Sequence, residues 1–114
     1  LELRPGWPDA MNNLAKALAL TGRGAEAVRV LEELRGRNPR YALAYASLGA
    51  NYFNLGDPVG AERVLRQGLA IAPENAQLHF TLALVLKATG RIEEALRERE
   101  RAVTLDPAMA AQPF

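Results

Sequence analysis

The chain of 114 residues is predicted to be all-α and to form an α-solenoid of antiparallel helix pairs. One observation behind this prediction is a repeat of 34 residues, a period typical of stacked supersecondary units. Another is that apolar residues recur at helical spacing within each unit, while no stretch alternates as a half-buried strand does. Four columns keep the period: Pro5, Pro39, Pro73 and Pro107; Gly22, Gly56 and Gly90; Ala27, Ala61 and Ala95; Leu14, Leu48 and Leu82.

We expect six helices, which cover residues 8–20, 24–36, 41–55, 58–71, 75–88 and 92–105. The first helix of each unit carries its inner residues at positions i, i+3, i+4 and i+7, which in the second unit are Tyr45, Leu48, Gly49 and Tyr52. Gly56 ends that helix, because glycine readily adopts the left-handed conformation that closes a helix.

The second helix of each unit begins after a turn and stops before a proline. Asp57 is suited to cap helix 58–71, and Pro58 is suited to its first position. Ala61, Leu65 and Gly68 mark the inner face of this helix. A proline shortly after it prevents the helix from continuing.

Small residues recur where the two helices of a pair should touch. They form two columns, Ala15, Gly49 and Ala83 on the first helix and Ala27, Ala61 and Ala95 on the second. A side chain of one carbon or none lets the helix axes approach closely. A bulky residue at Ala61 or Ala95 should therefore cost about 1–3 kcal/mol of stability.

The composition excludes several classes of function. Fourteen basic and thirteen acidic residues give a net charge of +1, without the cationic excess that a nucleic-acid groove needs. No apolar run approaches the roughly 20 residues needed to cross a bilayer, so we expect no membrane insertion. The absence of cysteine excludes disulfides and leaves the compartment unreadable, with a cytoplasmic location slightly favoured. The richness in Ala, Leu, Arg and Gly points to a bacterial gene.

The chain resembles the tetratricopeptide repeat family. This resemblance implies a right-handed superhelix with repeats at 8–41, 42–75 and 76–109, a tail of a preceding repeat at 1–7 and a C-terminal end at 110–114. Because the chain begins at Leu1 and not at a methionine, we expect a fragment of a larger protein. The family pattern reads Tyr45, Leu48, Gly49, Tyr52, Ala61, Leu65, Gly68 and Pro73 in the second unit; Met11, Leu14, Ala15, Leu18, Ala27, Leu31, Leu34 and Pro39 in the first; and His79, Leu82, Ala83, Leu86, Ala95, Arg99, Ala102 and Pro107 in the third.

Two departures from the pattern occur near the end of the chain. Arg99 replaces the apolar residue found as Leu31 and Leu65, and Pro113 stands where a further unit would carry its first core residue. Both favour an array that stops near Phe114. No polar capping helix follows, although solenoids usually need one. We therefore expect an end of the array to be covered by missing sequence or shared in a homo-oligomer.

We expect no enzymatic activity, and no catalytic, metal or cofactor site. The single histidine, His79, lies on the core face and has no cluster of ligands in its motif, so we interpret it as a packing residue. The glycines match neither a phosphate-binding loop nor a dinucleotide fingerprint. The acidic and basic residues of helix 92–105 alternate, as in the i, i+4 pair Glu93 and Arg97, and we interpret them as a solvated outer face.

The resemblance implies that the first helices of successive repeats line a concave face where partners bind as peptides or helices. Counting about 100° per residue places one set of side chains opposite the core face. Ala19 lies on this face, and Ser47 and Thr81 flank it. The predicted partner-binding residues are Asn12, Asn13, Lys16, Leu20, Leu43, Ala46, Ala50, Phe53, Asn54, Gln77, Phe80, Leu84 and Lys87.

The predicted face is mainly apolar, which favours an amphipathic helix or an apolar peptide as the partner. Some relatives grip a carboxylate with a basic clamp, but this face offers only Lys16 and Lys87. An asparagine ladder would start at Asn13 but does not continue at Ser47 or Thr81.

The sequence leaves three alternatives open. The apolar residues could pack against neighbouring helices, the repeats could assemble into a homo-oligomer, or the chain could be a regulatory domain of a larger enzyme.

Overall fold

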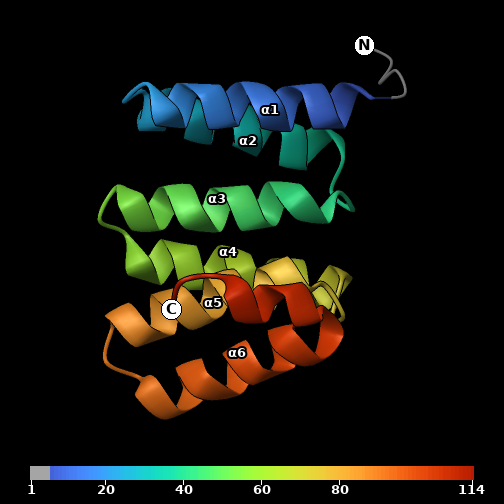
Figure 1. The fold of residues 1–114 in the computed structure, drawn as a ribbon. Coiled ribbons are helices and arrows are strands. Elements are labelled where there is room, and N and C mark those ends of the chain that lie inside the picture. The colour runs from blue at the N-terminus through green and yellow to red at the C-terminus, as the bar shows by residue number, and fades with distance from the viewer. Residues whose placement is uncertain (1–5) are drawn as a thin grey trace.

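The computed structural model describes residues 6–114, which form six α-helices and a 3₁₀ helix (Figure 1). The helices are α1 (Trp7–Leu20), α2 (Gly24–Arg37), α3 (Ala42–Asn54), α4 (Pro58–Ile71), α5 (Ala76–Ala88), α6 (Ile92–Leu105) and η1 (Pro107–Ala111). The all-α prediction is confirmed, and each expected helix lies within one residue of its predicted bounds. The short helix η1 was not predicted. The expected repeat tail at 1–7 falls mostly outside the described residues.

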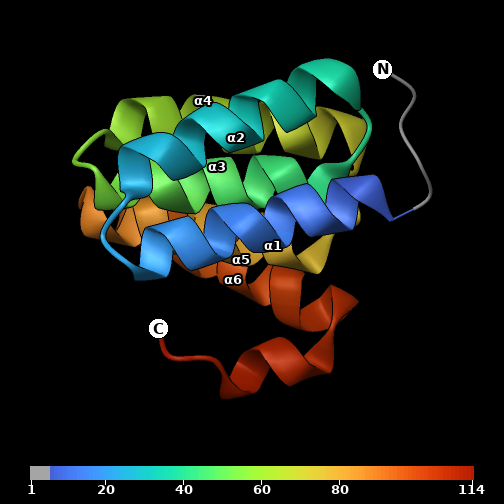
Figure 2. The same cartoon turned by 90° about the horizontal axis from the view of Figure 1, so that it is seen from above.

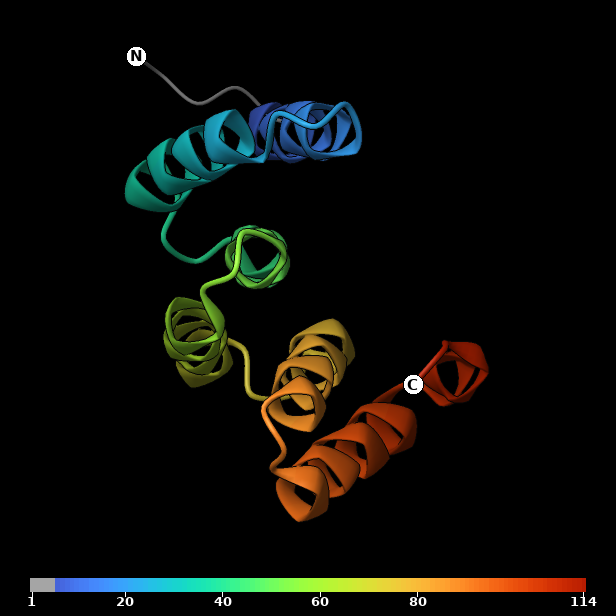
Figure 3. The same ribbon diagram turned by 90° about the vertical axis from the view of Figure 1, so that its left-hand side faces the viewer.

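The helices pack as consecutive pairs that stack along a curved path. Each of α1, α3 and α5 packs most closely against the helix that follows it, and the described chain measures 43 × 27 × 23 Å. Viewed along the helices, α1, α3 and α5 line the inner side of the curve (Figure 3). The stack therefore presents one face made only from the first helices of the pairs. Helix η1 lies beside α6, away from the first pair (Figure 2).

Small residues and leucines form the core as the repeat columns predict. Both predicted columns of small residues are fully buried, as are Leu48 and Leu82. Leu14, which occupies the same column, is 47% exposed. Leu48 and Leu82 each face a preceding helix pair, whereas no described helix precedes α1.

The turn between α3 and α4 is built as predicted. Gly56 has a φ of 87°, a conformation that glycine adopts without the steric cost of a Cβ atom. Asp57 caps α4, since its Oδ1 accepts a hydrogen bond of 2.8 Å from the Gly60 amide.

In the second and third helix pairs, the side chain at one repeat position contacts a main-chain carbonyl in the loop that precedes the pair. The Tyr45 hydroxyl donates a hydrogen bond of 2.8 Å to the carbonyl of Pro39. His79, in the same column, places Nε2 2.7 Å from the carbonyl of Pro73 and Nδ1 2.9 Å from Glu98 Oε1. His79 is therefore a buried packing residue, as predicted. Its hydrogen bonds explain how a polar ring is accommodated there.

The outer charged face differs in part from the expectation. Glu98 is only partly exposed because it bonds to His79, and Arg99 is partly buried toward the chain end. The expected pair between Glu93 and Arg97 is not among the ion pairs of residues 6–114. Instead, Arg91 bridges two helices, at 2.9 Å from Glu94 and 2.7 Å from Glu62.

Candidate functional site

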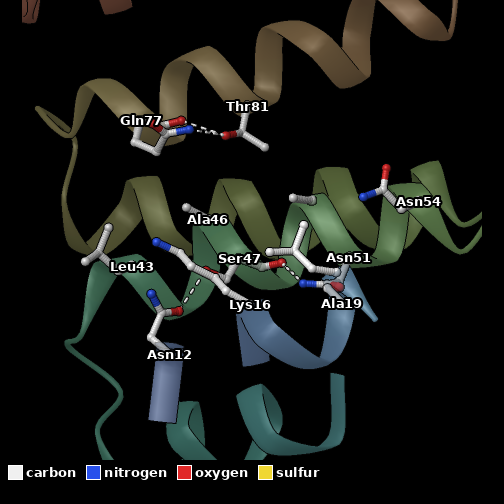
Figure 4. Close-up of a pocket in the computed structure, with 12 residues that line it drawn as sticks. Asn12, Lys16, Ala19, Leu43, Ala46, Ser47, Asn51, Asn54, Gln77 and Thr81 are labelled. Atoms are coloured by element: carbon white, nitrogen blue, oxygen red, sulfur yellow. Dashed lines mark hydrogen bonds between the residues drawn. The ribbon is translucent and has the colours of Figure 1, made fainter. Parts of the chain in front are cut away.

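The inner face of the stack contains two adjoining hollows, and we call them together the groove. Figure 4 shows the residues that line the first hollow. The first has a volume of about 480 Å³ and the second about 540 Å³, within the range of ligand sites. They share Ala50, Asn54 and Thr81, so the groove is continuous from α1 to α5. The other lining residues of the first are Asn12, Lys16, Ala19, Leu20, Leu43, Ala46, Ser47, Asn51 and Gln77, and those of the second are Phe53, Leu84, Val85, Lys87 and Ala88.

Hydrogen bonds fix the polar side chains of the first hollow. Ser47 Oγ donates to Asn12 Oδ1 at 2.7 Å, and Asn51 Nδ2 donates to the Ser47 carbonyl at 2.8 Å. On α5, Gln77 Nε2 donates to Thr81 Oγ1 at 3.1 Å (Figure 4). Within residues 6–114, neither the amide nitrogen of Asn12 nor the amide oxygen of Gln77 makes a hydrogen bond. The Gln77 oxygen is available to a ligand because this side chain is exposed, whereas Asn12 is only 3% exposed.

Exposed apolar side chains form the walls of the groove. Leu43 is 41% exposed in the first hollow, and Leu84 is 36% exposed and Phe53 partly exposed in the second. Leu20 is the most exposed large apolar side chain of the described chain. Apolar surface gathered in a hollow is typical of a surface that another molecule covers.

The charge in the groove has one sign. Lys16 lines the first hollow and Lys87 lines the second, and no lining residue is acidic. The two ammonium groups therefore favour a ligand that carries carboxylates or main-chain oxygens near its ends.

The structure brings eleven of the thirteen predicted residues into the groove. Asn13 is exposed but lines neither hollow. Phe80 was expected to be exposed in the groove and is only 4% exposed. The prediction missed Asn51, Val85 and Ala88. Asn51 and Val85 share a column with Ala17, whose chemistry differs in each repeat, so no common pattern marked them.

Phe80 is buried because Phe114 covers it. The two ring centroids are 6.1 Å apart, and the Lys87 ammonium lies 4.8 Å from the centroid of Phe114. Lys87 also donates a hydrogen bond to the main-chain oxygen of Phe114. Residues after η1 thus occupy surface on α5 that helical counting assigned to a partner.

Metal ligands, membrane-spanning helices and the histidine were also considered among the described residues. Within 6–114, no three or more acidic or histidine side chains are grouped to hold a metal ion. None of these helices combines the length and the apolar character needed to span a membrane. Both ring nitrogens of His79 already face the oxygens of Pro73 and Glu98.

The family models that match the chain all describe the same kind of repeat. Two family models described as tetratricopeptide repeat match residues 52–111 and 8–33. Protein FlbA of Caulobacter vibrioides is 34% identical over 88% of the chain, and the uncharacterized protein y4yS of Sinorhizobium fredii is 32% identical over 89%. The chain spans 17% of FlbA and 56% of y4yS. Both relatives are bacterial, which fits the expected bacterial origin.

Solved structures share the fold. A crystal structure of MamA has a TM-score of 0.77 at 22% identity, covering 90% of this chain and 60% of that one. MamA from Desulfovibrio magneticus RS-1 has a TM-score of 0.71 at 27% identity, covering 88% and 56%. The second TPR of Spaghetti (RPAP3), bound to the HSP90 peptide SRMEEVD, has a TM-score of 0.79 at 14% identity, covering 87% and 92%.

Proposed function

The chain belongs to the tetratricopeptide repeat family, and from this premise we propose that it is a protein–protein interaction scaffold whose groove binds a peptide or an amphipathic helix. The observation that carries the proposal is the continuous hollow along α1, α3 and α5 with Leu43, Phe53 and Leu84 on its walls. A peptide bound to a neighbour of the same fold supports this class of partner.

The chemistry of the groove defines the partner more closely. Leu43 and Leu84 would receive apolar anchors that recur at i, i+3, i+4 and i+7 of a bound helix. Lys16 and Lys87 would meet acidic residues outside those anchors, and the free amide oxygen of Gln77 would meet a polar atom at the edge. Two separated lysines among apolar residues fit this ligand better than a basic clamp on one carboxylate.

The proposal assigns the chain a binding role and not a catalytic one. His79 is the only histidine, and its ring already bonds to two protein oxygens. A histidine that acts as a general base must have a ring nitrogen within hydrogen-bonding reach of the substrate, and both ring nitrogens of His79 are already occupied.

A second candidate is a homo-oligomer formed through the first helix pair. Leu14 is exposed in a column where Leu48 and Leu82 are buried, so α1 presents apolar surface of the kind that another pair covers. Light scattering over a range of concentrations would test it. A mass that rises with concentration in the wild type but not in a Leu14→Glu variant supports this assembly, and a constant monomer mass contradicts it.

The groove proposal is tested by selecting peptides from a display library on the immobilised wild-type chain. Selected peptides are then titrated against two variants. One is Leu43→Glu/Leu84→Glu, which places two charges on the groove walls. The other is Val59→Glu/Leu96→Glu, a matched control that makes the same kind of change on exposed residues of α4 and α6 outside the groove.

We expect the selected peptides to carry apolar residues at helical spacing and to lose at least about tenfold in affinity for the groove variant, as burial of a leucine-sized group predicts. The control variant should bind as the wild type does. Equal binding to both variants, or a loss only in the control, would contradict the proposal.

A further inference from the structure

The segment 107–114 lies against α5 and α6 at the end of the groove. It consists of η1 and three further residues, of which Phe114 packs on Phe80 and is partly buried. The Arg99 guanidinium lies 5.4 Å from the centroid of the Phe114 ring, on the α6 side. One aromatic side chain is thus held by a ring, an ammonium and a guanidinium, all of which bind aromatic groups favourably.

The segment is held by few contacts. None of the residues of η1 is buried, and the backbone hydrogen bonds of 107–114 are local ones. The bonds to the rest of the chain are the Lys87 bond to Phe114 and a long one of 3.4 Å from Arg99 Nη2 to the Ala110 carbonyl. A segment so held can leave its place without unfolding the helix pairs.

Lys87 contributes both to the groove and to the surface on which Phe114 packs. It lines the second hollow together with Phe53 and Leu84, and it also holds the ring and the main-chain oxygen of Phe114. A partner that uses Lys87 must therefore compete with Phe114. Release of Phe114 would extend the groove to Phe80.

We propose that Phe80, Lys87 and Arg99 form an aromatic-anchor site, and that Phe114 occupies it as a built-in competitor of the partner. This regulation rests on the proposed function of the groove. The external ligand is an aromatic residue whose neighbouring carbonyl or carboxylate oxygen reaches the two cations. Within 6–114, neither Lys87 nor Arg99 pairs with an acidic side chain, and the oxygens that they contact are the main-chain oxygens of Phe114 and Ala110 in the segment itself.

Arg99 gives a specific reason why Phe114 is an incomplete ligand. Among the described residues, Arg99 Nε is the buried side-chain polar atom without a hydrogen-bond partner. A buried donor without an acceptor is unfavourable. A partner that brings an acceptor oxygen to this nitrogen would bind more favourably than Phe114 does, and would displace it.

The test supplies the segment from outside. The probe is the amidated peptide DPAMAAQPF, which is residues 106–114, and the control peptide has alanine in place of its phenylalanine. Each is titrated to about 5 mM, a concentration that matches the millimolar range of a tethered competitor. Backbone amide chemical shifts are recorded for the wild-type 114-residue chain and for its Phe114→Ala variant.

We expect the probe to return the amide shifts around Phe80 and Lys87 in the Phe114→Ala variant to their wild-type positions. In the wild type the same amides should shift about fivefold less, because the site is already filled. The control peptide should shift neither chain. A Lys87→Glu change in the Phe114→Ala chain alters an exposed residue and should abolish the response.

Shifts of equal size in both chains, or none at Phe80 and Lys87 in the variant, would overturn the inference. The result is separable from the groove test, because the probe is not a library peptide. If the probe restores the shifts but no library peptide depends on the groove walls, the proposed function fails and the anchor site stands. If library peptides bind the groove and the probe does not restore the shifts, the proposed function stands and the anchor site fails.

Discussion

A change of Gly68 to alanine tests the close packing that shapes the stack. Gly68 lies on α4, facing α3. A Cβ atom built at Gly68 would lie 2.6 Å from the Cβ of Tyr45 and 3.0 Å from a methyl carbon of Leu78. The Cβ of Tyr45 moves only with its backbone, so a rotamer change cannot relieve this contact. The variant must separate α3 from α4.

The expected loss in the free energy of unfolding is the difference between two opposing effects. Overpacking a tight core costs about 1–3 kcal/mol, and a clash with a backbone-fixed atom belongs at the upper end. Alanine regains about 1 kcal/mol of helix propensity over glycine. The net loss is about 2 kcal/mol. An unfolding entropy of about 0.24 kcal/mol/K for 114 residues converts this loss to a fall of about 8 °C in Tm.

The assay is thermal unfolding followed by circular dichroism, with Gly36→Ala as the matched control. Gly36 is also helical, but a Cβ there meets nothing within 4 Å. The control should therefore be neutral or more stable, by up to about 1 kcal/mol. If Gly68→Ala melts at or above the wild-type temperature, the close approach of α3 and α4 is not as described.

Three further outcomes are expected. Asp57→Ala removes the cap of α4 and should cost about 1 kcal/mol in a denaturant titration. His79→Leu leaves the Pro73 carbonyl without its partner and should cost about 1–3 kcal/mol, whereas His79→Tyr should cost less. Burial and a hydrogen bond to Asp9 raise the pKa of Tyr41 to about 12, so the wild type should lose stability as the pH rises from about 10 to 12. Tyr41→Phe should lose less over that interval, and an equal loss would contradict this assignment.

The fold was predictable because each 34-residue unit repeats the same local sequence pattern. Apolar spacing sets the helices, Gly56 and Asp57 set a turn, and small residues such as Ala61 set the helix spacing. These signals act within a few residues or recur in a column. A single sequence therefore suffices to read them.

The groove was predictable only in part. Helical periodicity identifies the face that contains Leu43 and Leu84, because that face depends on the residue count alone. Phe114 falls in the 34-residue column of Phe80, but the residues before it form a 3₁₀ helix and not the first helix of a further repeat. Periodicity therefore could not predict that Phe114 packs on Phe80 across the end of the stack. The burial of Phe80 and the sharing of Lys87 therefore appear only when the whole chain is assembled.

The central claim is that the face made by α1, α3 and α5 binds the partner. The most direct measurement is amide chemical-shift mapping of the wild-type chain with a peptide selected from the display library. The account predicts that the largest shifts fall on residues of α1, α3 and α5 that line the groove, among them Ala46, Ala50 and Leu84. Shifts confined to α2, α4 and α6 would contradict it.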